Sequence, residues 1–267
     1  MGGGVVSSLV GRSILVVGAS AGVGRAFASR AVAAGAEVVL SARRPERLAD
    51  AIEVAGGGIP VVGDVRQEAD CRRIVEQAVD HVGPLDLLFY AAGFAPLRAL
   101  IETDSADWRE VLETNVIGLQ QVLAAAVPRM TAGGVAAVLS SETVGRPRSG
   151  LGAYGASKAA LAESLRAWRL EHPEVRFACL ALGATQPTEF GDRFDPHLLG
   201  PVLDDWVRQG LIQETYMHTD EVAGLLIDLL ASALEFPGIG IEDVVLRSPS
   251  PVIGSESAFP SLPDERR

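Results

Sequence analysis

Short runs of aliphatic and β-branched residues alternate along this chain with longer stretches in which apolar residues recur every three or four positions. The pattern predicts strands at the short runs and amphipathic helices at the longer stretches. The expected strands cover 13–18, 36–42, 59–65, 85–93, 134–141, 175–183 and 241–248. The expected helices cover about 23–34, 45–55, 67–82, 105–130, 152–171 and 220–232.

The expected strands are apolar on both faces, which is typical of a parallel sheet covered by helices on both sides. Repeated strand–helix units connect by right-handed crossovers and build a doubly wound α/β fold. We therefore predict a parallel sheet of about seven strands with helices on both faces.

No internal stretch is long or polar enough to divide the chain, so we expect one domain over residues 11–248. Within it, residues 184–218 separate the sixth strand from the next helix, and we expect them to form a lid over the substrate. The leader 1–10 and the Pro/Ser-rich tail 249–267 are expected to be flexible.

The composition excludes some classes of function. Hydrophobic residues make up 48% of the chain, enough for a large core, and the net charge of −11 argues against binding to nucleic acid or an anionic membrane. Cys71 and Cys179 match no disulfide framework or metal cluster, so we interpret them as structural thiols in a reducing compartment. The chain shows no signal peptide and no apolar run of about 18 residues, so we expect a cytoplasmic protein.

A glycine-rich turn, "VVGASAGVGR", joins the first strand to the first helix. Gly18, Gly22 and Gly24 permit a tight turn and close approach of a pyrophosphate, and the helix start offers free N–H groups to phosphates. An ordinary strand–helix turn is the alternative, since glycine is common in this chain. The position of the turn favours a Rossmann-like dinucleotide site.

Tyr154 and Lys158 are four residues apart in a stretch expected to be helical, so their side chains share a face. A free phenol titrates near ~10, and bringing it to about 7 requires roughly 4 kcal/mol of preference for the phenolate. An ammonium about 5 Å away supplies on the order of 3 kcal/mol at an effective dielectric of about 20. The pair can therefore act as an acid/base, although such pairs also occur by chance.

The Gly-x-x-x-Gly-x-Gly turn together with Tyr-x-x-x-Lys resembles the short-chain dehydrogenase/reductase family, in its compact single-domain branch, over roughly residues 10–248. The resemblance implies that Ser141 binds the substrate oxygen and that Asn115 supports a water relay to the lysine. It also implies a homodimer or homotetramer, with the helix of Tyr154 at a subunit interface.

The end of the second strand indicates the cofactor. Where members that prefer NAD carry an acidic residue, this chain has Ala42, followed by Arg43 and Arg44. A guanidinium can bind a 2′-phosphate that a carboxylate would repel, so we predict NADP(H) rather than NAD(H). Two solvated arginines at a helix start are the alternative. The resemblance adds Asp64 as an adenine contact and further cofactor contacts at Ser20, Val23, Val65, Ala91, Gly93, Tyr154, Lys158 and Gly183.

The chain departs from the family pattern at three places. Val17 replaces the usual Thr before the glycine turn, Ala91 replaces an Asn after the fourth strand, and Leu182 replaces a Pro before Gly183. These changes affect cofactor positioning rather than proton transfer. Two nearby threonines, at 185 and 188, both suit the threonine that the family places after Gly183, and the sequence does not choose between them.

Several apolar side chains either line a substrate pocket or hold the lid to the body. They are Phe94, Phe190, Phe194, Leu198, Leu199 and Trp206. The first possibility predicts an apolar ketone or alcohol as substrate. His197 is interpreted as a loop residue without a catalytic role.

The pattern favours an NADP(H)-dependent oxidoreductase that interconverts a ketone or aldehyde and an alcohol, with Tyr154 as the acid/base. The departures at Ala91 and Leu182 motivate an alternative, a non-catalytic dinucleotide-binding sensor or scaffold. A third reading, an epimerase or dehydratase of the related extended type, calls for a longer C-terminal substrate domain than this chain shows.

Overall fold

The computed structural model describes residues 9–192 and 194–253, and a seven-stranded sheet lies at its centre. The strand order is β3-β2-β1-β4-β5-β6-β9, and every neighbouring pair is parallel. The strands are β1 (Ser13–Val17), β2 (Glu37–Ala42), β3 (Ile59–Val62), β4 (Leu85–Tyr90), β5 (Met130–Ser141), β6 (Arg176–Leu182) and β9 (Asp243–Leu246). The chain order reverses between β1 and β4, which opens a crevice at the carboxyl ends of these strands. The predicted α/β fold is confirmed.

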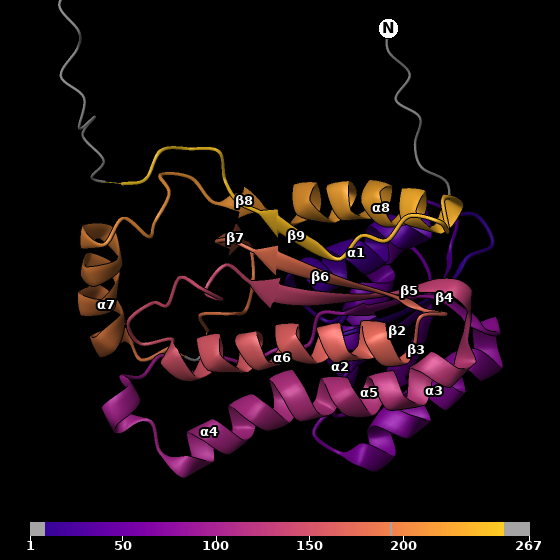
Figure 1. Cartoon of the computed structure of the whole chain (residues 1–267), viewed down its shortest axis with the longest axis horizontal. Coiled ribbons are helices and arrows are strands. Elements are labelled where there is room, and N and C mark those ends of the chain that lie inside the picture. The colour runs from indigo at the N-terminus through magenta and orange to yellow at the C-terminus, as the bar shows by residue number, and fades with distance from the viewer. Residues whose placement is uncertain (1–8, 193, 254–267) are drawn as a thin grey trace, which may run out of the picture.

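Helices cover both faces of the sheet (Figure 1). One face carries α1 (Gly22–Ala33), α2 (Pro45–Ala55) and α8 (Thr219–Glu235). The other carries α3 (Glu68–Val82), α5 (Gly118–Ala126) and α6 (Gly152–Glu171). In Figure 1, α1 and α8 lie above the sheet, and α3, α5 and α6 lie below it.

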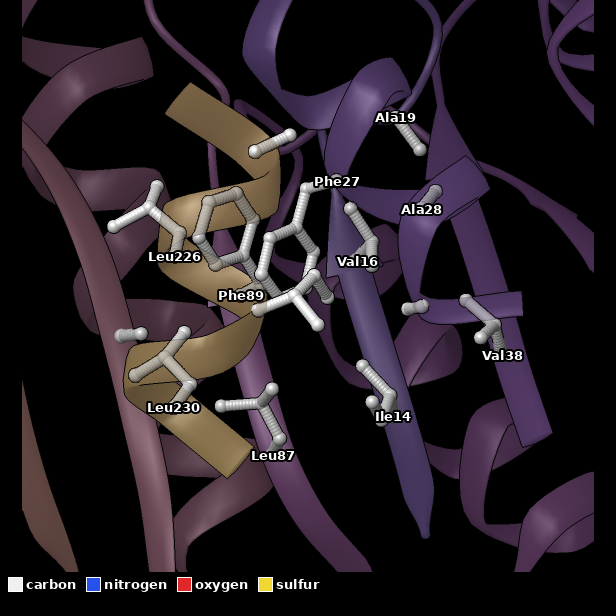
Figure 2. Packing of buried hydrophobic residues seen from close by; sticks show 14 of the residues in the cluster. Ile14, Val16, Ala19, Phe27, Ala28, Val38, Leu87, Phe89, Leu226 and Leu230 are labelled. Carbon is white, nitrogen blue, oxygen red and sulfur yellow. The ribbon is translucent and has the colours of Figure 1, made fainter. Parts of the chain in front are cut away.

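The side chains of each strand point alternately into two separate hydrophobic cores. In β1, Ile14 and Val16 pack under α1 and α8, while Leu15 and Val17 pack against the helices of the opposite face. This explains why the strand is apolar at every position from Ile14 to Val17. Figure 2 shows the first core, where Phe27 of α1 stacks on Phe89 of β4 with ring centroids 3.8 Å apart.

The expected helix over 105–130 is interrupted. It divides into α4 (Ser105–Leu112), a π-helical turn (Glu113–Ile117), α5 and a short 3₁₀ helix (Val127–Arg129). A π turn widens the helix by one residue and often occurs at functional sites. Here it contains Asn115, one of the predicted site residues.

Element boundaries also differ from the expected ones. β4 ends at Tyr90 rather than at residue 93, because Ala91 leaves the strand and its N–H bonds Val17 beside the glycine turn. β5 begins at Met130, four residues earlier than expected. A further 3₁₀ helix, Leu100–Glu102, precedes α4.

The segment predicted as a lid has its own secondary structure. β7 (Thr185–Gln186) pairs with β8 (Met217–His218), so the two ends of the segment are held together. Between them lies α7 (Pro196–Arg208), beyond the carboxyl ends of β5 and β6 in Figure 1. Asp195 caps this helix by accepting a hydrogen bond from the N–H of His197.

The described ends of the predicted leader and tail are hydrogen-bonded to the body of the fold. Leu9 is buried and its N–H bonds the carbonyl of Ala34. Near the other end, the N–H of Ile253 bonds Ile212, which ties the start of the tail to the lid. Residues 1–8 and 254–267 of the predicted leader and tail lie outside the described residues.

Both cysteines are buried free thiols. Burial raises the pKa of Cys71 to about 11, and the Cys71 thiol donates to the carbonyl of Val65. Over the described ranges we find no group of residues arranged to hold a metal ion. None of the helices in those ranges has the length and apolar character needed to cross a membrane.

Candidate functional site

A cleft of about 450 Å³ opens at the carboxyl ends of the strands. The glycine turn and Tyr154 both line it, so the two motifs found in the sequence meet in one cavity. Every predicted cofactor contact lies on its wall: Gly18, Ser20, Gly22, Val23, Gly24, Arg43, Arg44, Asp64, Val65, Ala91, Gly93, Tyr154, Lys158 and Gly183. Of the predicted catalytic residues, Ser141, Tyr154 and Lys158 line the cleft, and Asn115 lies fully buried.

The glycine turn is packed too tightly for larger residues. Gly18 has a φ of +86°, and a Cβ there would lie 2.5 Å from the backbone nitrogen of Ala92. A Cβ on Gly24 would lie 2.3 Å from the carbonyl oxygen of Gly18. The turn therefore brings the start of α1 against the end of β4.

The start of α1 suits a pyrophosphate. Ala21 occupies the N-cap and has no side-chain oxygen to accept from the first N–H groups of the helix. The helix starts at Gly22, on the cleft wall. Its free N–H groups and the positive end of its dipole therefore lie at the cleft, where they can bind an anion. The residues present therefore fit a dinucleotide.

The arginines after β2 lie at one end of the cleft. Arg43 is exposed, and Arg44 forms the N-cap of α2. Arg44 Nη2 donates a 2.5 Å hydrogen bond to Glu189 of the lid, and Arg47 lies 3.6 Å from the same carboxylate. The sequence analysis missed Glu189, because its partners are about 145 positions away along the chain.

Asp64, predicted to contact the adenine, lies on the cleft wall with its carboxylate held by Arg66. Arg66 donates from its backbone N–H and from its guanidinium, at 2.6 to 3.1 Å. Burial opposes ionisation of Asp64, but these hydrogen bonds outweigh it and lower the pKa of the carboxyl below its usual value. Asp64 is therefore ionised at neutral pH.

Tyr154 and Lys158 share one face of α6, as predicted. The Lys158 Nζ lies 5.8 Å from the centroid of the Tyr154 ring and donates a 2.8 Å hydrogen bond to the carbonyl of Leu139. Both residues are buried, with 8% and 4% of their surfaces exposed. Burial lowers the pKa of Lys158 to about 8.

The expected lowering of the phenol pKa by Lys158 does not occur in this structure. Burial raises the pKa of Tyr154 to about 12, because desolvation disfavours the phenolate. A hydrogen bond from Ser141 and the positive charge of Arg148 oppose that effect. Arg148, which the sequence analysis did not select, is thus a cation that favours the phenolate.

Ser141 lies at the end of β5, within hydrogen-bonding reach of Tyr154. Its Oγ also accepts from the hydroxyl of Thr143 at 3.0 Å and from the N–H of Thr143 at 3.2 Å. These donors hold Ser141 Oγ in place at the cleft wall. Thr143 is a positioning residue that the sequence analysis did not identify.

The Asn115 side chain holds the loop after β4 through hydrogen bonds to its backbone. Its Oδ1 accepts from the N–H of Phe94, and its Nδ2 donates to the carbonyl of Phe94 and to Ser157 Oγ, at 2.8 to 2.9 Å. A Cβ on Gly93 would lie 3.6 Å from Asn115 Oδ1 and 3.7 Å from Lys158 Nζ. Asn115 and Lys158 therefore flank Gly93, and the relay role of Asn115 stays a prediction.

A buried ionic cluster lies next to the reacting groups. Glu142 directly follows Ser141, is 4% exposed and is bound by Arg148 and by Arg247, whose Nε is 3.0 Å from Glu142 Oε2. Arg148 also donates to the carbonyl of Leu211, at 2.8 Å, and lies over the Trp206 ring. The cluster thus connects β5, the lid and the end of β9. Only the acidic residue after Ser141 hints at it in the sequence.

The lid residues divide between the two roles that the sequence left open. Phe94 and Phe190 line the cleft, and the Phe190 ring meets the Tyr154 ring edge-on at 5.2 Å. The others pack the lid against Leu97 and Leu151: Phe194, Leu198, Leu199 and Trp206. His197 is exposed on α7 rather than in a loop, and it does not line the cleft.

Comparison with known proteins adds an independent line of evidence. The family described as short chain dehydrogenase matches residues 12–198. A glycine betaine reductase of Emericella nidulans is 34% identical over 169 residues, which cover 61% of this chain and 13% of the reductase. The oxidoreductase Lmo0432 of Listeria monocytogenes is 28% identical over 230 residues, which cover 84% of this chain and 90% of that protein.

A solved structure is similar over almost the whole chain. An alcohol dehydrogenase from the archaeon Thermococcus sibiricus, complexed with 5-hydroxy-NADP, has a TM-score of 0.76 at 25% identity. The similarity covers 89% of this chain and 97% of that one.

Proposed function

Because this chain belongs to the short-chain dehydrogenase family, whose members are oxidoreductases that bind a nicotinamide dinucleotide, we propose that it is an NADP(H)-dependent enzyme that interconverts a ketone or aldehyde and an alcohol. One observation carries the proposal: the glycine turn, the two arginines after β2 and the pair Ser141–Tyr154 line a single cleft. A dinucleotide bound along this cleft would extend from the arginines to the phenol.

In the direction of reduction, Ser141 binds the carbonyl oxygen and orients it toward the Tyr154 hydroxyl. The cofactor, when bound, supplies the hydride that the carbonyl carbon accepts. The carbonyl oxygen takes the proton of Tyr154, which leaves the tyrosine as phenolate. A pKa of about 12 keeps Tyr154 protonated at neutral pH, so the acid form needed for reduction is the resting form.

The positive charge of Arg148 and the hydrogen bond from Ser141 favour the phenolate that forms. Lys158 remains mostly protonated below pH 8. The ring of an oxidised nicotinamide is also cationic and would favour the phenolate further. Lys158 lies within the cleft wall where it would also hold the nicotinamide ribose.

Arg43 and Arg44 support the choice of NADP(H). The cleft wall at the end of β2 is formed by Ser41, Ala42 and these arginines, with no carboxylate at that end of the strand to accept from a ribose 2′-hydroxyl. The Thermococcus sibiricus enzyme, 25% identical, was solved with an NADP derivative. In the parent protein we expect NADPH to bind more tightly than NADH, and Arg43→Ala to reduce the difference.

The walls near Tyr154 favour an apolar substrate. Phe94, Phe190 and Leu151 line this part of the cleft. We also infer a homodimer or homotetramer that uses α6, where Ala156, Ala159 and Ala160 are exposed and would let a second helix approach closely. We also infer a cytoplasmic protein, and the negative net charge argues against binding to nucleic acid or an anionic membrane.

A non-catalytic cofactor sensor is the second candidate. It is favoured by the replacements at Ala91 and Leu182. A sensor, however, has no need of the buried Ser141–Tyr154 pair.

Consumption of NADPH across a panel of ketones and aldehydes distinguishes the two candidates. Tyr154→Phe should lower turnover by about 10²–10⁴-fold, the usual contribution of a general acid, while NADPH still binds. Tyr216→Phe deletes the same hydroxyl from an exposed tyrosine and serves as the matched control. If NADPH binds but no carbonyl is reduced and no alcohol is oxidised, the sensor is the better description.

A further inference from the structure

Three consecutive lid residues lie against three different parts of the cleft. Thr188 packs against the glycine turn, where a Cβ on Gly22 would lie 3.4 Å from its Cγ2. Glu189 binds Arg44, and Phe190 meets the ring of Tyr154. This tripeptide therefore follows the path along which the dinucleotide is proposed to lie.

The central residue of the tripeptide uses the donors that a phosphate would need. Glu189 accepts from Arg44 Nη2 at 2.5 Å and lies 3.6 Å from Arg47 Nη2. A carboxylate and a phosphate monoester bind a guanidinium in the same way, through charge-assisted hydrogen bonds to its N–H groups. The two anions cannot both use the same N–H group of Arg44.

We propose that Glu189 is a specificity-determining residue, whose carboxylate competes with the 2′-phosphate of the cofactor for Arg44. This rests on the proposed preference for NADP(H). A 2′-phosphorylated cofactor displaces Glu189 from Arg44, whereas a cofactor with a free 2′-hydroxyl leaves the ion pair in place. Glu189 thereby lowers the affinity for the phosphorylated cofactor and moves with the lid when that cofactor binds.

The relative strengths of the Arg44–Glu189 ion pair and of an Arg44–phosphate contact allow the phosphate to replace the carboxylate. Arg44 and Glu189 are 43% and 32% exposed, so solvent weakens their attraction. A 2′-phosphate carries between one and two negative charges at neutral pH and offers three acceptor oxygens, so it binds the arginine more strongly than one carboxylate does. The competing carboxylate is therefore displaced, at the cost of a moderate loss of affinity.

Binding of adenosine fragments tests the proposal without turnover. Isothermal titration calorimetry gives the Kd of 2′,5′-ADP and of 5′-AMP for the parent, for Glu189→Gln and for Asp204→Asn. We expect Glu189→Gln to bind 2′,5′-ADP about two- to fivefold more tightly, the range for a partly exposed ion pair, and 5′-AMP with unchanged affinity. Asp204→Asn removes the same charge from the exposed face of α7 and should leave both values unchanged.

A second pair of variants isolates the contact with Arg44. In an Arg44→Ala background, Glu189→Gln should change the affinity for 2′,5′-ADP by less than about twofold, since the shared partner is gone. Equal effects of Glu189→Gln with and without Arg44 would overturn the proposal. Weaker binding of 2′,5′-ADP to Glu189→Gln would also overturn it, because Glu189 would then orient Arg44 for the phosphate.

Failure of the cofactor assignment gives a different result. If the parent binds 2′,5′-ADP no more tightly than 5′-AMP, and NADPH no more tightly than NADH, the preference for NADP(H) is wrong and the proposed role of Glu189 is rejected with it. If the parent prefers the two ligands that carry a 2′-phosphate but Glu189→Gln does not change their affinity, only the role of Glu189 is rejected.

Discussion

The Nζ of Lys158 donates a 2.8 Å hydrogen bond to the carbonyl of Leu139, which lies two residues before Ser141 on β5. The bond ties α6 to the strand that carries the serine. It also holds an ammonium in a position that is only 4% exposed. Lys158 is the only lysine in the sequence, so its titration can be observed without interference from other lysines.

We predict that Lys158 titrates with a midpoint near pH 8, because burial disfavours its charged form. Reductive methylation with ¹³C-formaldehyde and an NMR titration measure the midpoint directly. The chain's terminal amine gives a second signal, and Lys158→Arg identifies which signal belongs to the lysine. A midpoint above pH 10 would contradict the prediction.

The same lowered pKa predicts how stability changes with pH. Between about pH 8 and the pKa of an unfolded chain's lysine, near ~10.4, the unfolded state binds more protons than the folded one. The contribution of Lys158 to the free energy of unfolding therefore rises with pH across this range and is constant below it. Urea unfolding of the parent and of Lys158→Met at pH 7 and pH 10 isolates the effect.

Breaking the ionic cluster after Ser141 should be costly. Arg148→Gln leaves the buried Glu142 with Arg247 as its remaining cation, and we expect a loss of about 3 kcal/mol in the free energy of unfolding. Adding Glu142→Gln should restore part of that loss. Arg166→Gln is the matched control, because its partner Glu163 is exposed and the pair contributes below about 1 kcal/mol. Equal losses in the two arginine variants would contradict the buried role.

Two helical glycines should respond in opposite ways to replacement by alanine. At Gly24 the new Cβ would meet the Gly18 carbonyl at 2.3 Å, so we expect destabilisation by about 1–3 kcal/mol and weaker NADPH binding. At Gly224 of α8 a Cβ meets nothing within 4 Å, and alanine should stabilise the helix by up to about 1 kcal/mol. Thermal unfolding and NADPH titration check both, and unchanged binding in Gly24→Ala would argue against the glycine turn as the phosphate site.

Phe190→Ala tests whether the cleft takes an apolar substrate. The ring is 42% exposed and lies edge-on to Tyr154, so its removal should change stability little but raise KM for a ketone that carries a large apolar group. A loss of about 1–2 kcal/mol of contact corresponds to roughly a five- to thirtyfold rise. Phe236→Ala, 55% exposed at the end of α8, should leave KM unchanged. An unchanged KM in Phe190→Ala would reject the apolar pocket.

Most of the fold could be predicted because its signals are local. Each strand is a short apolar run, and each helix shows its own spacing of apolar residues, so the seven strands and the helices around them follow from the order of residues. The π turn at Glu113–Ile117 could not be predicted, because Asn115 is held there by Phe94 and Ser157, which belong to other elements. Spacing along one helix contains no information on such partners.

In the candidate site, too, the features set by neighbouring residues could be predicted and those set by distant partners could not. Gly18, Tyr154 and their neighbours are recognisable because each motif lies within a few residues of chain. The ion pairs Glu142–Arg247 and Glu189–Arg44 join residues about 105 and 145 positions apart, and the charge of a residue does not reveal which opposite charge it will meet.

By itself, then, the sequence determined the parallel sheet, the glycine turn and the side of α6 that carries Tyr154 and Lys158, because backbone propensity and helical spacing act between near neighbours. Only the tertiary structure decided the environment of these groups. Burial sets the pKa of Tyr154 at about 12 and that of Lys158 at about 8, and desolvation depends on every element packed around a side chain rather than on the residues beside it in the chain.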